Sequence, residues 1–246
     1  MKEILGIDVG ATGIKGALVN IRTGKLVSEK FKVKTPSPAT PEAIGDSLKM
    51  MAENFNWYGK QTGIGFPSVI RHGKSFTASN IDPAFIGFPI EDEYAKIFNG
   101  ELTVVNDADA AGIAEMTHGK GKGQNGLVIL ITLGTGIGSA IFLDGKLLPN
   151  TEFGQLYYKK SVFEKYASNS AREIKHLSWK AWGKELNTYL NHINLLLSPD
   201  LILIGGGVSK HFANYSEYLQ VDTRLETALL LNEAGIIGAA MSAVRH

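Results

Sequence analysis

The sequence contains no cysteine, which excludes disulfide bonds, thiolate nucleophiles and zinc sites built from thiolates. It also lacks an excess of charge of either sign, because its 25 Lys and Arg residues are nearly balanced by 24 Asp and Glu residues. A formal net charge of +1 creates no global field that would favour nucleic acid or an anionic membrane as the main partner. We therefore expect neither kind of partner, and any anion site must be local.

Long hydrophobic runs are missing as well. No apolar stretch reaches the roughly 20 residues that span a bilayer, because the runs at 127–133 and 201–204 are both closed by glycine. The chain passes from Met1 directly into an apolar strand pattern, without a charged and apolar leader. We expect a cytoplasmic protein.

What is present is an ordinary globular composition, with 44% hydrophobic and 20% charged residues. A length of 246 residues permits two compact lobes, each with its own core. The run at 118–126 is rich in glycine and charge and has no periodicity, which indicates a boundary. We predict an N-terminal α/β lobe over residues 1–118, with a C-terminal helix at about 233–246 packing back on it, and a C-terminal α/β lobe over residues 119–232.

Both lobes show the same order of elements, with apolar strands joined by glycine turns and then helices and single strands. The strands are expected at 4–8, 14–19, 26–33, 62–66, 102–105, 127–133, 137–143, 146–148 and 201–204. The helices are expected from Pro41 to about 54 after a Thr40 cap, over 110–116 with Asp109 as a cap, from Ser178 to Pro199, and over 234–244. This repetition predicts two sheets flanked by helices, with the ligand in a cleft between the lobes.

The segment from Gly6 to Lys15 places a carboxylate at a strand end and follows it with a glycine-rich turn. Backbone N–H groups around Gly10 can bind phosphate oxygens, Thr12 can donate a hydrogen bond, and Lys15 can neutralise charge. Asp8 can hold a hydrated Mg²⁺ ion. The segment is not a P-loop, since it lacks the Gly-Lys-Ser/Thr ending. An ordinary glycine hairpin with exposed polar residues is the alternative interpretation.

The turn Gly134-Thr135-Gly136 repeats this device in the second half of the chain. Two such hairpins, each opening a strand meander in its own lobe, can bind a polyanion from both sides of a cleft. The alternative is that the glycines at 134–138 only permit a tight turn.

A third polar segment follows the apolar strand at 102–105, where Asn106 and Asp107 stand at the carboxyl end. This end of a strand is the usual ligand side of an α/β sheet. A sugar hydroxyl is a weak nucleophile, so a carboxylate that orients it and accepts its proton promotes phosphoryl transfer. We assign this role to Asp107. Asp109 is the rival, and capping of the following helix accounts for it.

Two weaker segments lie in the second half. Glu152 and Gln155 follow a short strand and offer a carboxylate and an amide for sugar hydroxyls, although an isolated glutamate is more often a solvated loop charge. Gly206 and Gly207 follow a buried strand and allow a nucleotide to approach the backbone closely.

In this order, these segments resemble the ROK family of sugar kinases, within the actin/hexokinase/Hsp70-like superfamily, and most of all its polyphosphate glucokinase and glucomannokinase branch. The likeness spans nearly the whole chain. The segments that carry it are Gly6–Val19, Asn106–Gly112, Leu133–Ala140, Pro149–Glu152, Ser198–Ile202 and Gly205–Lys210.

The resemblance implies a two-lobed actin-like ATPase fold of the hexokinase-like, ribonuclease H-like type. It also implies a glucokinase-like hexose 6-phosphotransferase with polyphosphate or ATP as donor and Mg²⁺ as cofactor. We expect a homodimer. Many members of the family carry a Cys-rich zinc motif, which a chain without cysteine cannot form. The absence of zinc agrees with the polyphosphate-using branch.

The resemblance assigns the acceptor site as well. It implies Asp107 as the base, in contact with the sugar, and places Asn80, Asn106, Glu152 and Gln155 around the sugar hydroxyls. Only five residues precede Gly6, so the DNA-binding helix-turn-helix of the family's repressors is not expected.

Three positions depart from the family pattern. Gln155 stands where histidine is usual, Ala11 replaces a glycine and tolerates no positive φ, and Ser68 replaces a glycine near the sugar. These departures leave open a kinase for a different sugar, or a non-catalytic or regulatory sugar-binding protein. Lys120 and Lys122, in the boundary run, either guide a long polyanion or are simply solvated.

Overall fold

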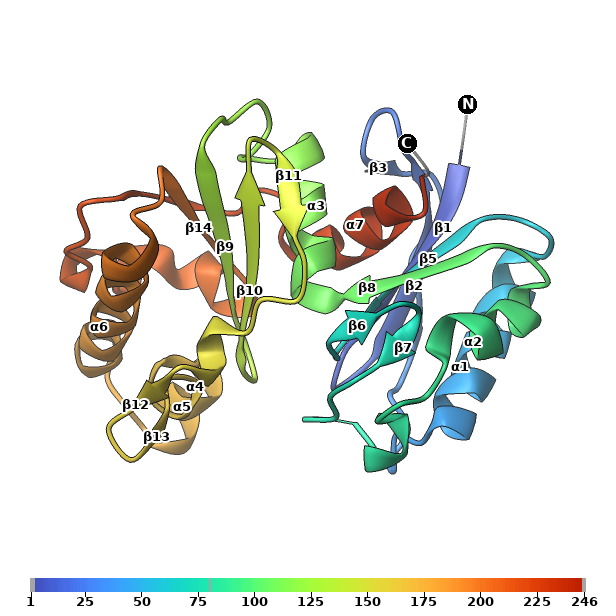
Figure 1. Ribbon diagram of the computed structural model, residues 1–246, viewed down its shortest axis with the longest axis horizontal. Coiled ribbons are helices and arrows are strands. Elements are labelled where there is room, and N and C mark those ends of the chain that lie inside the picture. The colour runs from blue at the N-terminus through green and yellow to red at the C-terminus, as the bar shows by residue number, and fades with distance from the viewer. Residues whose placement is uncertain (1–2, 80, 245–246) are drawn as a thin grey trace. The chain divides into compact units, whose positions relative to one another are not determined.

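The structure is a computed structural model that describes residues 3–79 and 81–244. The chain divides into two compact units (Figure 1). Unit 1 comprises Met1–Ala114 and Glu233–His246, and unit 2 comprises Glu115–Asn232. The boundary at Ala114 lies inside helix α3 (Asp107–His118). No helix in the described part of the chain combines the length and the apolar composition needed to cross a membrane.

Unit 1 is built on a six-stranded sheet with the order β3-β2-β1-β5-β8, and β4 also pairs with β2. Its strands are β1 (Glu3–Val9), β2 (Ile14–Asn20), β3 (Lys25–Leu26), β4 (Phe31–Val33), β5 (Thr62–Phe66) and β8 (Leu102–Asn106). β1 is antiparallel to β2, whereas β1, β5 and β8 run parallel. The carboxyl ends of these three parallel strands therefore meet at one edge, the usual ligand side.

Helices lie on both faces of this sheet. Successive side chains of a strand point to opposite faces, so each strand can pack against a helix on either side. Leu5 and Ile7 of β1 pack in one core with Ile44 and Leu48 of α1. The other face of β1 contacts α7. The helices of unit 1 are α1 (Pro41–Phe55), α2 (Ile90–Phe98) and α7 (Ala234–Ser242), and a small hairpin is formed by β6 (Ile70–Arg71) and β7 (Lys74–Ser75).

Helix α7 packs against the sheet at glycines that allow its backbone to approach. A Cβ atom on Gly63 of β5 would lie 1.7 Å from the carbonyl oxygen of Ala239, and one on Gly6 of β1 would lie 2.0 Å from that of Ile236. A third contact joins α7 to α3, since a Cβ on Gly238 would lie 1.6 Å from the carbonyl oxygen of Ala110. No side chain fits at these contacts, so glycine sets the position of α7 on unit 1.

Unit 2 contains a five-stranded sheet with the order β11-β10-β9-β14-β15. Its strands are β9 (Leu127–Leu133), β10 (Ile137–Leu143), β11 (Lys146–Leu148), β14 (Leu201–Gly205) and β15 (Arg224–Thr227), and β12 (Tyr157–Tyr158) pairs with β13 (Ser161–Val162). The helices are α4 (Glu164–Ala167), α5 (Asn169–Ile174) and α6 (Trp179–Leu197). The 3₁₀ helices of the two units are η1 (Pro83–Phe85), η2 (Phe153–Gln155), η3 (Gly207–Asn214), η4 (Ser216–Tyr218) and η5 (Leu231–Glu233).

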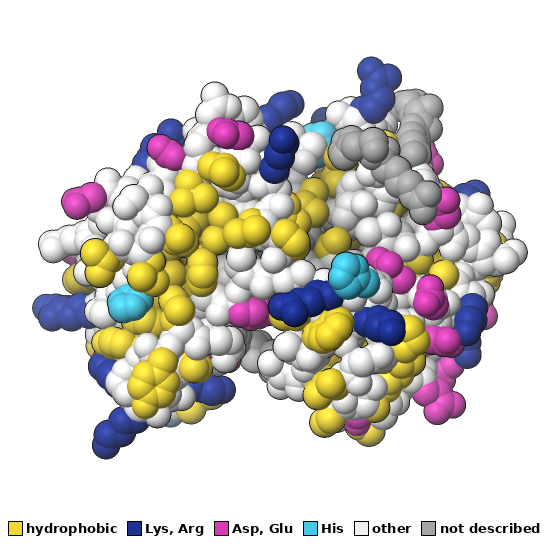
Figure 2. All heavy atoms as spheres, in the orientation of Figure 1, with side chains coloured by type: hydrophobic (Ala, Val, Ile, Leu, Met, Phe, Trp, Pro, Cys, Tyr) yellow, Lys and Arg dark blue, Asp and Glu magenta, His cyan; other side chains and the backbone are white. Residues whose placement is uncertain are grey.

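The apolar face of α6 covers the unit 2 sheet. Trp182 and Tyr189 are fully buried among Ile129 and Ile204 of the strands, and Ser178 caps the helix by accepting from Ala181 N. The aromatic residues of this helix thus form core. β11 is one edge of this sheet. Figure 2 shows exposed hydrophobic side chains over β10 and β11.

Two predicted elements need correction. The single strand expected at 26–33 is two short strands, β3 and β4, because the Ser28 hydroxyl accepts the hydrogen bond of Leu18 N (2.9 Å) that a continued strand would take. Helix α3 begins at Asp107 rather than near 110, so Asp109 is not its cap. The cap is Asn106, whose Oδ1 accepts from the backbone N–H groups of Ala108 and Asp109.

Candidate active site

The first glycine hairpin joins β1 to β2 and is closed by a hydrogen bond from Gly10 N to Gly13 O (3.1 Å). The Thr35 hydroxyl donates to Gly10 O (2.6 Å) and ties the turn to the segment after β4. Ala11 does not adopt a positive φ, so alanine fits here without backbone strain. Thr12, at the tip, is exposed and accessible to a ligand.

A carboxylate and an ammonium group lie at the base of this hairpin. Asp8 and Lys15 are cross-strand partners, and Lys15 Nζ lies 4.0 Å from Asp8 Oδ2. The first turn of α7 packs on the same carboxylate, since a Cβ on Gly235 would lie 2.7 Å from Asp8 Cγ. Burial raises the pKa of Asp8 above its ordinary value, and Lys15 lowers it. Asp8 is thus a partly desolvated carboxylate beside the turn.

The side chains in this region fit a magnesium ion held mainly by its substrate. Among residues 3–79 and 81–244, no cluster of three or more His, Asp or Glu side chains could enclose a metal. Mg²⁺ is commonly held by one or two carboxylates and by substrate phosphates, with water in the remaining positions. Asp8, next to a turn suited to phosphate, provides a carboxylate of this kind.

The start of α3 brings Asn106 and Asp107 to the same edge of the sheet. The Asn106 amide is buried, and its Nδ2 donates to Ser68 O (3.3 Å) while its Oδ1 caps the helix. Asp107 is half-buried at the first position of α3, where the helix dipole stabilises a carboxylate, and its Oδ1 accepts from Ala108 N (2.8 Å). Asp109 is only 1% exposed. A substrate from solvent can therefore reach Asp107 more readily than Asp109.

One row of the sheet links this carboxylate to the hairpin. Gly65 of β5 pairs with Asp8 on one side and with Val105 on the other. A Cβ on Gly65 would lie 3.7 Å from the Cα of Asp107 and 3.8 Å from Gly235 O. Asp8 and Asp107 thus flank the carboxyl end of β5, with the starts of α7 and α3 above it.

Two further predicted positions lie nearby in the sequence. The Ser68 hydroxyl is buried and contacts the Ser75 hydroxyl (2.7 Å) and Thr77 O (2.8 Å), so it ties β5 to the β6–β7 hairpin. Asn80, expected to hold the sugar, lies outside the described residues.

In unit 2, the second glycine hairpin joins β9 to β10. Gly134 N donates to Gly136 O (3.0 Å), and Ser170 N of α5 donates to Gly134 O (3.1 Å). Thr135, between the glycines, is exposed. The Glu164 carboxylate of α4 accepts from Ile137 N (3.1 Å), which fixes the other side of the turn. The hairpin is therefore held by two helices that follow it in the sequence.

The first glycine after β14, Gly206, lies against the end of β9 beside this hairpin. Gly206 has a φ of 79°, and its Cβ would lie 2.4 Å from Leu133 O at the end of β9. Gly134 and Gly207 are different, because neither has a positive φ and a Cβ on either would meet no atom within 4 Å. Nothing inside the chain requires glycine at these two positions, as expected where a ligand approaches the backbone.

Two carboxylates, Glu152 and Glu164, interact electrostatically in unit 2. Glu152 precedes η2 and is exposed, yet partial burial of its carboxyl group and the neighbouring Glu164 raise its pKa. Both carboxylates also help to raise the pKa of the buried Tyr189 hydroxyl, after burial itself. Gln155, at the end of η2, is exposed. Glu164 was missed in the sequence because no strand end or glycine turn marks it.

A model of the ROK family matches residues 4–152, which is more than half of the chain. The chain belongs to the ROK family. This ROK chain is 41% identical to the polyphosphate glucokinase of Mycobacterium tuberculosis over 240 residues, which cover 97% of the chain and 90% of the relative. It is 40% identical to the Mycobacterium leprae polyphosphate glucokinase over 238 residues, which cover 96% of the chain and 73% of the relative.

Solved structures agree with the family assignment. The inorganic polyphosphate/ATP-glucomannokinase of Arthrobacter sp. strain KM is 41% identical and superimposes with a TM-score of 0.95, covering 99% of this ROK chain and 98% of the other. A ROK family glucokinase from Streptomyces griseus superimposes with a TM-score of 0.81 at 24% identity, covering 97% and 98% of the two chains. These matches confirm the predicted two-lobed actin-like ATPase fold.

Proposed function

We propose that this ROK protein is a glucokinase-like hexose 6-phosphotransferase that uses polyphosphate, ATP or both as phosphoryl donor. The observation that carries the proposal is the shared edge of unit 1, where the half-buried Asp107 and the hairpin with Asp8 and Lys15 flank the end of β5. A base for the hydroxyl and a binding site for the transferred phosphoryl group are then neighbours, as the reaction requires. The polyphosphate glucokinases at 40% and 41% identity support the same activity.

In this mechanism, Asp107 orients the 6-hydroxyl group and accepts its proton as the bond to phosphorus forms. The N–H groups around Gly10 and the side chains of Thr12 and Lys15 stabilise the charge on the transferred group. When bound to Asp8 through water, Mg²⁺ supplies positive charge to the donor phosphates. The turns of unit 2 bind the donor through Gly134, Thr135, Gly136, Gly206 and Gly207.

We assign the binding of the sugar hydroxyl groups to five polar residues, namely Asn80, Asn106, Asp107, Glu152 and Gln155. We add Glu164 to this set, because its carboxylate interacts with that of Glu152. Carboxylates of this kind accept hydrogen bonds from sugar hydroxyl groups.

The test is a phosphotransfer assay with glucose, mannose and fructose, each offered with ATP and with polyphosphate in the presence of magnesium. We expect glucose or mannose 6-phosphate from at least one donor, detected by mass spectrometry. Binding of a sugar without transfer from either donor would contradict the proposal and favour a sugar-sensing protein.

A substitution at Gly134 separates donor binding from folding. Because a Cβ there meets no atom within 4 Å and the φ is ordinary, Gly134→Ala is expected to leave the urea midpoint unchanged. The added methyl group would meet a donor phosphate instead, so we expect kcat/KM for the donor to fall about tenfold. Wild-type kinetics in this variant would show that no donor approaches Gly134.

The homodimer and the cytoplasmic location also remain predictions. The surface that a second copy would cover includes Leu143 at the end of β10 and Leu148 on the edge strand β11, which are 58% and 57% exposed. Sedimentation equilibrium would give the mass of the assembly, and a monomer at micromolar concentration would contradict the dimer.

A further inference from the structure

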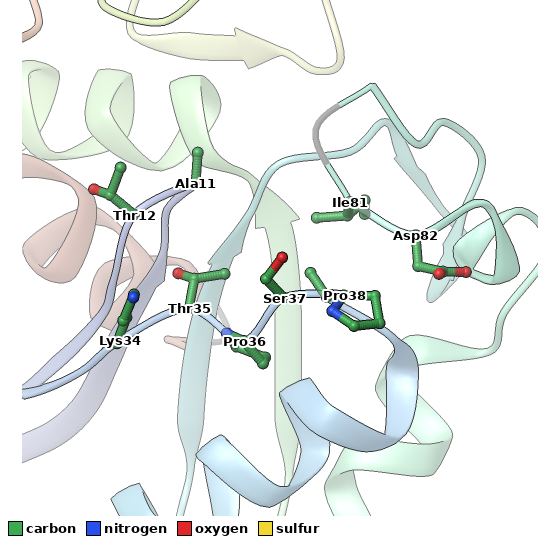
Figure 3. Close-up of a pocket in the computed structure, with 10 residues that line it drawn as sticks. Ala11, Thr12, Lys34, Thr35, Pro36, Ser37, Pro38, Ile81 and Asp82 are labelled. Carbon is green, nitrogen blue, oxygen red and sulfur yellow. The ribbon is translucent and has the colours of Figure 1, made fainter.

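A cavity of about 490 Å³ lies within unit 1, beside the first hairpin (Figure 3). Its walls are the hairpin tip with Ala11 and Thr12, the segment 34–39, and Ile81 and Asp82. The Thr35 hydroxyl donates to Gly10 O (2.6 Å), and Asp82 N donates to Ala39 O (3.2 Å), so hydrogen bonds tie the walls together. Of the residues that line this cavity, only Thr12 takes part in the proposed mechanism.

Positive charge gathers around this cavity. Lys34 lines it, and in Figure 3 the Lys34 side chain rises from the segment 34–39 towards the hairpin, while the Ser37 hydroxyl points into the space between the hairpin and Ile81. Lys32 lies over the same turn, because a Cβ on Gly13 would be 2.7 Å from Lys32 Cε and 3.7 Å from its Nζ. Within the described ranges, no carboxylate lies within ion-pair distance of Lys32 or Lys34.

The acidic residue of the cavity has another partner. Asp82 caps η1, and its Oδ1 accepts from Ala84 N (2.9 Å). The groups left to contact a ligand are therefore mainly donors, namely the Lys34 ammonium group and the hydroxyl groups of Thr12 and Ser37. Such a set suits a ligand with several anionic oxygens.

The lining and the position of the cavity indicate which kind of anion it binds. Its ten lining residues include two prolines and one isoleucine but no aromatic ring on which a nucleotide base could stack. The cavity also begins at Thr12, directly beside the turn that is assigned to the transferred phosphoryl group. A linear condensed phosphate, which carries charge along its whole length and has no base, fits both features.

We propose that this cavity binds the phosphate residues of inorganic polyphosphate that follow the transferred one. This proposal rests on the function proposed above. In the transfer, the bond between the terminal phosphorus and the bridging oxygen breaks, and the bridging oxygen stays on the shortened chain. The sugar oxygen forms the new bond, and its proton goes to Asp107. The leaving chain carries the additional negative charge, which Lys34 and Lys32 stabilise.

The sequence offers Lys120 and Lys122, in the boundary run, as alternative guides for a polyanion. Lys120 Nζ lies 3.5 Å from Glu226 Oε2, so its charge is partly neutralised within unit 2. The two lysines beside the first hairpin have no such partner among the described residues.

The first experiment is a donor comparison with the Lys34→Ala variant. Loss of a charge-assisted contact to the donor should raise the KM for polyphosphate about tenfold, and the KM for ATP should change less than twofold. Lys25→Ala is the matched control, because Lys25 is an exposed lysine of β3 in the same unit, does not line the cavity and forms no ion pair in the described ranges. Equal increases in both KM values, or none, would overturn the assignment of the cavity.

The second experiment measures binding without turnover. Isothermal titration of the wild-type protein with tripolyphosphate, in the absence of sugar, should give a dissociation constant that Lys34→Ala raises about tenfold. Titrations with orthophosphate and with glucose 6-phosphate distinguish a condensed phosphate from a single phosphate group or the product. If either of these binds as tightly as tripolyphosphate, the proposal is wrong. Tripolyphosphate binding that depends on Lys34 would stand even if no sugar were phosphorylated, so the two proposals fail separately.

Discussion

Replacing Asp107 with asparagine is expected to lower kcat for sugar phosphorylation about a thousandfold while the protein stays folded. The amide keeps the size of the side chain and can still accept the hydrogen bond of Ala108 N through its oxygen. It cannot accept the proton of the 6-hydroxyl group at neutral pH. Steady-state kinetics with a saturating donor measures the loss, and a circular dichroism spectrum like that of the wild type verifies the fold.

The matched variant is Asp109→Asn, two residues along the same helix. Asp109 is buried inside α3, so we expect a loss of stability but a kcat much closer to that of the wild type at a temperature where the variant is folded. If the two results were exchanged, with Asp109→Asn inactive and Asp107→Asn active, the base would be Asp109.

The second large effect concerns stability. Gly63→Ala should lower the free energy of unfolding by about 3 kcal/mol, because overpacking a tight contact costs that much when the neighbour cannot move aside. The neighbour here is backbone, since the new Cβ would lie 1.7 Å from Ala239 O of α7. Urea denaturation followed by circular dichroism would show a lower midpoint for this variant.

Gly45→Ala is its control within unit 1. Gly45 lies inside α1, and a Cβ there would be 3.5 Å from Tyr94 Cε1, an ordinary contact. Alanine is favoured over glycine in a helix by about 0.5–1 kcal/mol, so this variant should be slightly more stable than the wild type. A Gly63→Ala protein as stable as Gly45→Ala would mean that α7 does not pack on β5 as closely as described.

Much of the strand pattern could be predicted because it depends on local signals. The strands at 62–66, 127–133 and 137–143 have the predicted bounds. The last two are apolar runs between glycine-containing turns, and Pro67 follows the first. The helix after Ser178 also agrees with its cap and its apolar spacing. Elements that depend on distant partners were missed, such as α2, whose Glu91 accepts a hydrogen bond from Val104 N of β8.

The candidate site shows the same division. Asp8 and Asp107 were found because each stands at the carboxyl end of an apolar strand. Asn106 was expected to hold the sugar, but its capping of α3 became visible only when the hydrogen bonds were known. Glu164 and Lys32 reach glycine turns from positions far along the chain, and no motif near either residue reports such a contact.

The packing of α7 has a consequence for the way the protein is made. Residues 1–114 leave the ribosome well before 234–242, so β1 and β5 must wait for the helix that covers one of their faces. The whole of unit 2 is synthesised between the two segments of unit 1 and can fold before unit 1 is complete. The nascent N-terminal half thus exposes a bare sheet face during translation, when chaperones can bind it.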